Sequence, residues 1–222
     1  MNQRAFLKIA AISATIAIAL LFVLAGMAMR FQYAFPGEDI FTGRVTPTAA
    51  EFARHVAGVQ AYYAADALFI ISDTIAWLGL AVLVRSRQPV LGNVVLGLSL
   101  AGGLLDFIEN EMVLALLSIP QAKIAEHLGW YLAWRTVQRF SYMILFSAAA
   151  VAAVGLWSRK PLDRAVALIG TGLLAITIVA FYNPALYIAS NVWWLVWIAG
   201  AGVLLWRRAA EWPEQELPSN SP

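Results

Sequence analysis

The sequence contains no cysteine and only two histidines among its 222 residues. Without cysteine there is no disulfide, iron–sulfur cluster, thiolate zinc site or cysteine nucleophile. Two histidines also exclude a metal centre built mainly from imidazole ligands. Charged residues are scarce as well, at 13%, where a soluble domain carries about 25%. The net charge of +2 is too small and too dispersed to indicate nucleic-acid binding.

Apolar residues are abundant. They make up 61% of the chain, against about 45–50% in a soluble domain, and the mean hydropathy is +0.73. A chain of this length could not bury so much apolar surface in a soluble core. We therefore expect the lipid bilayer to be a partner of this protein.

Six apolar runs are each long enough to cross a bilayer, which takes about 20 helical residues. They lack the period-2 alternation that is typical of a membrane β-barrel. We predict an all-α fold, a polytopic integral membrane protein in which residues 1–210 form one domain, a bundle of six transmembrane helices. The predicted spans are residues 5–29, 60–84, 90–119, 128–157, 165–182 and 185–206. Residues 30–47 are predicted to form an outer loop, and residues 211–222 a cytoplasmic polar tail.

The positions of arginine and lysine predict the orientation. Those on one side of the predicted bundle are Arg4, Lys8, Arg85, Arg87, Arg159, Lys160, Arg164, Arg207 and Arg208. Short segments rich in these residues stay in the cytoplasm, so we expect a multi-pass protein of the inner (plasma) membrane with both termini cytoplasmic. A cleaved signal peptide is an alternative for the first run, although its apolar part is longer than a typical signal core.

Charged residues inside the second, third and fourth runs are the main functional clue. An unpaired Asp, Lys or Arg near the middle of a membrane helix costs about 2.5–3.5 kcal/mol, so these side chains must face protein or water. Helical spacing places polar residues on one face of each of these three helices. The predicted ligand-binding residues are Asp66, Asp73, Asp106, Glu109, Asn110, Arg135, Gln138, Arg139 and Tyr142.

The depth of these groups follows from the helical rise. Asp66, Asp106, Glu109, Arg135 and Arg139 fall about 24–33 Å from the cytoplasmic ends of their spans, in the outer leaflet, whereas Asp73 falls at about 16 Å. We expect the two arginines to neutralise the carboxylates at their own level. The carboxylates still outnumber the arginines, so some of them hold protons or a cation binds among them, with Asp73 as the candidate.

Three functional hypotheses fit this pattern. The first is an outward-facing pocket that binds or transports a charged small molecule, a lipid headgroup or a cation, with the outer loop over its entrance. The second is an intramembrane lipid-modifying enzyme with a carboxylate-bound metal, for which no catalytic residue or motif is visible. The third is a structural or assembly subunit, in a homo-oligomer or with a partner membrane subunit, whose charges only fix helix packing.

The histidines, three tryptophans and a glycine pair support further expectations. His55 and His127 lie at the outer ends of their predicted helices, so we expect neither bis-histidine haem nor another cofactor. Trp193, Trp194 and Trp197 are expected to contact lipid or pack between helices rather than form a ligand wall. The Gly102-Gly103 pair predicts that another helix approaches closely beside the charged residues.

Overall fold

The computed structural model describes residues 2–30, 49–117, 128–182 and 186–212 of the chain. Within these ranges it is all-helical and contains no strand. The helices are α1 (Gln3–Arg30), α3 (Ala49–Arg85), α4 (Pro89–Leu117), α5 (Leu128–Leu156), α6 (Pro161–Tyr182) and α7 (Tyr187–Glu211). Each of these six helices is long and apolar enough to cross a membrane, as the sequence predicts.

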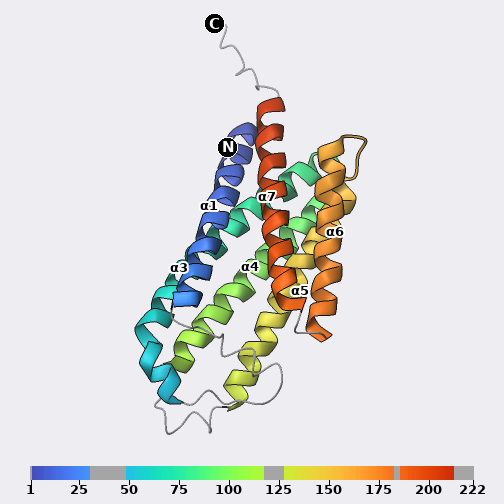
Figure 1. Cartoon of the computed structure of the whole chain (residues 1–222). Coiled ribbons are helices and arrows are strands. Elements are labelled where there is room, and N and C mark those ends of the chain that lie inside the picture. Colours follow the sequence, from blue (N-terminus) through green and yellow to red (C-terminus); the bar gives the residue numbers. More distant parts are fainter. Residues whose placement is uncertain (1, 31–48, 118–127, 183–185, 213–222) are drawn as a thin grey trace, which may run out of the picture.

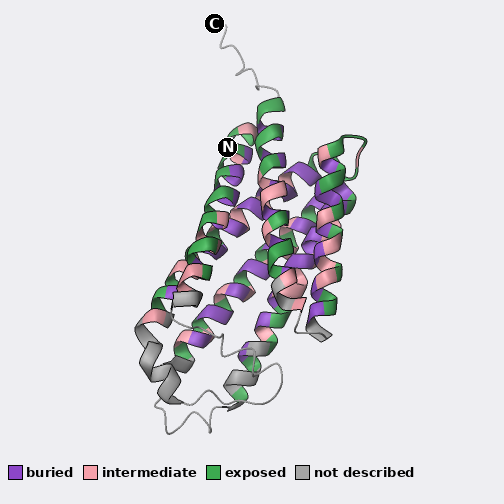
Figure 2. Ribbon diagram, viewed as in Figure 1, coloured by how far each residue is buried: buried purple, intermediate pink, exposed green. Residues whose placement is uncertain are grey.

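The helices form a closed bundle (Figure 1). Each packs against its neighbours in the sequence, and α7 packs against α1, so the first and last helices close the ring. Helix α3 also contacts α5 and α7, which places it near the centre. The buried residues face the inside of the bundle and the exposed ones its outer surface (Figure 2). That distribution is the one a bilayer favours, because lipid can solvate the exposed apolar side chains.

The helix boundaries differ in detail from the predicted spans. Helix α3 begins at Ala49, but its apolar span begins at Gln60, where the sequence predicts it. Helix α6 begins at Pro161, four residues early, since proline is well suited to the first turn of a helix. Helix α7 continues to Glu211, past the predicted end at residue 206. The outer loop, residues 30–47, lies almost wholly outside the described residues, as does nearly all of the predicted tail.

Small residues let the helices approach one another beside the predicted site. A Cβ atom on Gly102 of α4 would lie 2.5 Å from Cγ of Leu145 on α5. A Cβ atom on Gly103 would lie 2.5 Å from Oγ1 of Thr74 on α3. The prediction from the glycine pair is confirmed, and α4 approaches both of its neighbours closely at this level.

Candidate functional site

A cavity of about 310 Å³ opens among α1, α3, α4, α5 and α7. Its volume lies at the lower end of the range of small-molecule sites, about 300–1,000 Å³. Its lining residues are Leu21, Phe22, Leu24, Ala25, Tyr62, Tyr63, Asp66, Phe69, Asp106, Glu109, Gln138, Tyr142, Asn191, Val192, Trp194 and Leu195. A mostly apolar wall with a few polar groups converging on one side is typical of a ligand site.

The polar side of the cavity is acidic. Asp66 comes from α3, and Asp106 and Glu109 from α4. The Asp106 carboxylate interacts electrostatically with those of Glu109 and Asp66, and also with that of the deeper Asp73. No lysine or arginine is found among the lining residues that the structure describes. A cation in the cavity would therefore offset a concentration of buried carboxylates that is otherwise costly.

Glu109 is held in place by two donors from α5. Its Oε1 atom accepts a hydrogen bond from Nε2 of Gln138 at 2.7 Å and another from Nε1 of Trp134 at 3.2 Å. All three side chains are buried. These bonds fix the carboxylate at the cavity wall and join α4 to α5 at the same point.

Aromatic side chains from α1, α3, α5 and α7 also line the cavity. The Trp194 ring meets Phe69 of α3 edge-on at a centroid distance of 5.4 Å. It also meets Tyr142 and Phe146 of α5 edge-on, at 6.1 Å and 5.8 Å. Carboxylates and aromatic rings therefore border one space. This combination suits an ammonium group, which is attracted both by negative charge and by the faces of aromatic rings.

Asp73 lies deeper in α3 and does not line the cavity. Its Oδ2 atom accepts a hydrogen bond from Nε1 of Trp77 at 2.9 Å. Its Oδ1 atom has no hydrogen-bond partner in the part of the chain that the structure describes. With the residue only 4% exposed, Asp73 is a buried acid one level below the cavity floor.

Of the two arginines of α5, the structure describes the side chain of Arg139 alone. Arg139 is exposed on the surface of α5 and does not line the cavity, whereas the adjacent Gln138 is buried beside Glu109. The long arginine side chain can carry its charge to the membrane interface, which the sequence reading did not consider for this residue. The side chain of Arg135 lies outside the described residues, so its predicted pairing stays a prediction.

The structure thus brings part of the predicted set together. The members that line the cavity are Asp66, Asp106, Glu109, Gln138 and Tyr142. Asn110 is buried next to them on α4 and interacts with the Asp66 carboxylate. Asp73 lies below the cavity, and Arg139 lies on the bundle surface.

The residues that sequence reasoning missed come from the first and last helices. Trp194 packs between helices, which was one of the two expectations for it, and it also lines the cavity, which was not expected. Leu21 and Leu24 of α1 complete the apolar wall. Neither helix carries a charged residue at this level to mark it. The cluster of tryptophans in α7 was the available signal.

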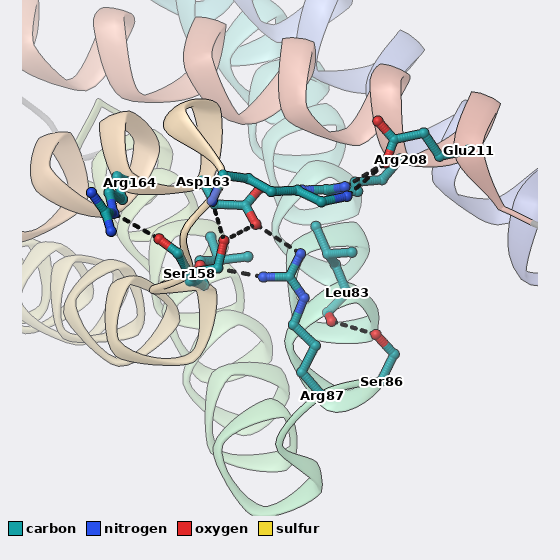
Figure 3. A network of polar contacts seen from close by, with 10 residues as sticks. Leu83, Ser86, Arg87, Ser158, Asp163, Arg164, Arg208 and Glu211 are labelled. Carbon is teal, nitrogen blue, oxygen red and sulfur yellow. Dashed lines mark hydrogen bonds and ion pairs between the residues drawn. The ribbon is translucent and has the colours of Figure 1, made fainter.

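A second charged cluster ties together the other end of the bundle (Figure 3). Asp163 of α6 is fully buried and pairs with Arg87 after α3 at 2.9 Å and with Arg208 of α7 at 2.5 Å. Ser158 donates a further hydrogen bond to Asp163 at 2.7 Å, and Arg208 also pairs with Glu211. The sequence reading placed both arginines at helix ends but did not single out Asp163.

The remaining sequence expectations concern the two histidines, the outer loop and a metal site. His127 and the outer loop lie outside the described residues, and so does the side chain of His55. Among the residues whose placement is described, no group of three or more histidine or acidic side chains could hold a metal ion. The described part of the chain thus gives the metal-enzyme hypothesis no support.

Comparison with known proteins identifies no relative. The sequence matches no protein-family model, and the chain matches neither a curated protein nor a solved structure.

Proposed function

We propose that this protein is a multi-pass membrane protein whose cavity binds a small ligand or headgroup that carries an ammonium group, as a binding or transport protein. The observation that carries the proposal is the lining of the cavity. Asp66, Asp106 and Glu109 line it, no cationic side chain is found among its described lining residues, and aromatic side chains, among them Tyr142 and Trp194, line it as well. An ammonium ligand would neutralise the carboxylates and contact the rings.

The size of the cavity supports a compact ligand. At about 310 Å³ it has room for roughly ten water molecules, taking about 30 Å³ for each. A short amine fits within this space. A bare metal ion is a poorer match, because the described acidic residues do not form a ligand set for one.

Binding is testable with n-butylammonium chloride, using potassium chloride at equal ionic strength as the reference salt. A ligand that binds the folded state raises its unfolding midpoint. We expect n-butylammonium to raise the midpoint of the protein in phosphatidylcholine nanodiscs, in a saturable way. The effect should disappear in Asp106→Asn and weaken at least tenfold in apparent affinity in Asp66→Asn.

Glu111→Gln is the matched control, because Glu111 is an exposed carboxylate on the same helix and lies outside the cavity lining. It should respond as the unmodified protein does. If n-butylammonium has no effect, or acts equally on all four proteins, the binding proposal is wrong. The carboxylates would then be assigned to helix packing, as the third sequence hypothesis holds.

We further propose that the protein lies in the inner membrane with both termini in the cytoplasm. Support comes from the end of the bundle where α1 begins and α7 ends (Figure 1). Arg85 is the last residue of α3, and Arg87 and Arg208 both pair with Asp163 at this end. Because the chain has no cysteine, single-cysteine variants can be labelled cleanly. A membrane-impermeant maleimide should label Gln60→Cys on intact cells and should label Ser86→Cys only after lysis. The reverse pattern would invert the proposed orientation.

A further inference from the structure

The cavity has a mouth between α1 and α7 that is formed by exposed side chains. Phe22 of α1 is 64% exposed and Val192 of α7 is 55% exposed, yet both line the cavity. Asn191, also exposed, adds an amide at the same place. On the opposite wall Asp106 and Glu109 are buried. The lining thus passes from buried and acidic to exposed and mainly apolar.

This mouth lies within the membrane-spanning parts of both helices. Phe22 is five residues inside the end of the apolar span Gln3–Met27, and Val192 is three residues inside the start of the span Ala189–Glu211. At 1.5 Å per residue these positions are about 8 Å and 5 Å below the ends of the spans. The mouth therefore faces the acyl chains of one leaflet rather than water.

The volume of the cavity limits the size of the group that it can enclose. A cavity of about 310 Å³ can hold a headgroup, but a long hydrocarbon chain would exceed it. A chain attached to a headgroup beside Asp106 would leave through the mouth, past Phe22 and Val192, into the bilayer. Such a chain stays in an apolar medium throughout, so its passage requires no exposure of hydrocarbon to water.

We infer that the ligand is an amphiphile, an amine-bearing lipid that enters the cavity sideways from the bilayer between α1 and α7. Its ammonium headgroup lies among Asp66, Asp106 and Glu109, and its hydrocarbon tail remains in the leaflet. This inference rests on the proposed function, since it assigns a tail and a route to the ammonium ligand proposed above.

The experiment compares two amines with the same headgroup, n-butylamine and n-dodecylamine, in phosphatidylcholine nanodiscs. A bulky group is placed at the mouth by labelling Val192→Cys with pyrenyl maleimide, which has no native cysteine to react with. Val203→Cys with the same label is the matched control. Val203 lies eleven residues along the same helix face, is 51% exposed and does not line the cavity.

We expect the apparent affinity for n-dodecylamine to fall at least tenfold in the protein labelled at residue 192 and to stay unchanged in the protein labelled at residue 203. Both labelled proteins should bind n-butylamine equally. Labelled Phe22→Cys places the obstruction on the other rim and should repeat the result if the variant at residue 192 does not fold. Partition of n-dodecylamine into the bilayer is common to all samples and cancels in the comparison.

The outcomes separate the two proposals. If n-butylamine binds in a carboxylate-dependent way but the labels at residues 192 and 203 leave n-dodecylamine binding alike, entry from the bilayer is wrong and the ammonium site stands. If neither amine shifts the unfolding midpoint in a way that Asp106→Asn abolishes, the proposed function itself is wrong.

Discussion

The buried acids of this protein differ in how many hydrogen-bond donors the structure gives them. Glu109 receives N–H groups from both Gln138 and Trp134 on the neighbouring helix. Asp73 receives one, from Trp77 a turn later on its own helix. A carboxylate oxygen that accepts N–H groups is held in place by them, whereas a buried acceptor without a donor lowers stability. Asp106 differs from both, because the described groups that act on its carboxylate are other carboxylates, those of Glu109, Asp66 and Asp73.

The bond between Trp77 and Asp73 predicts the effect of a single substitution. Trp77→Phe removes the only described donor to the Asp73 carboxylate while keeping a large buried ring in place. A buried acceptor that loses its partner costs about 1–3 kcal/mol. We expect the free energy of unfolding to fall by that amount, measured by titration with sodium dodecyl sulfate from mixed micelles.

Trp194→Phe makes the same change at another buried tryptophan. Its Nε1 atom has no hydrogen-bond partner among the residues that the structure describes, so no bond to a protein group there is lost. The cost should be clearly smaller than that of Trp77→Phe. In an Asp73→Leu background, Trp77→Phe should also lose most of its effect, because no carboxylate remains to be stranded. Equal losses at both tryptophans would contradict the assigned hydrogen bond.

At the scale of the helix, the sequence predicted α4 better than α5. The polar residues predicted on α4, which are Asp106, Glu109 and Asn110, are all buried. Helical periodicity was sufficient there because short polar side chains must stay near the backbone that carries them. On α5 the same reasoning placed Arg139 with Gln138, although a long cationic side chain can leave that face for the membrane interface.

Close packing of α4 predicts that replacing glycine with alanine affects the free energy of unfolding differently at two positions of this helix. A Cβ atom on Gly102 would collide with the buried Leu145, so Gly102→Ala should lower the free energy of unfolding by about 1–3 kcal/mol. A Cβ atom on Gly97 meets nothing within 4 Å, so Gly97→Ala should be neutral or stabilise the helix by up to about 1 kcal/mol. Unfolding titrations of the two variants check the difference, and a loss of stability at Gly97 as large as that at Gly102 would contradict the packing.

At the scale of the whole molecule, the cavity depends on which helices lie side by side, and helical periodicity in the sequence does not show this. Its acidic residues were predictable because charge inside an apolar run is conspicuous. Its apolar wall was not predictable, because Leu24 and Trp194 resemble many other lipid-facing or packing residues until α1 and α7 are placed side by side. Tertiary packing decides which apolar residues border a cavity, and a single sequence does not show it.

The charged cluster around Asp163 is expected to hold the helices together at the end of the bundle where α1 begins and α7 ends (Figure 1). Asp163 is fully buried and pairs with Arg87, which follows α3, and with Arg208 of α7. Asp163→Asn removes the charge that both guanidinium groups face. It leaves Arg208, whose side chain is only 9% exposed, with Glu211 as its remaining described ion-pair partner. Removing one member of a buried ion pair costs about 3–5 kcal/mol, and the substitution should lower the free energy of unfolding by an amount near the lower end of that range.

Lys160→Gln disrupts an exposed ion pair to Glu211 at the same end of the bundle and should cost less than about 1 kcal/mol. Equal stability of the two variants in unfolding titrations would show that the Asp163 cluster does not hold α6 and α7 to the end of α3.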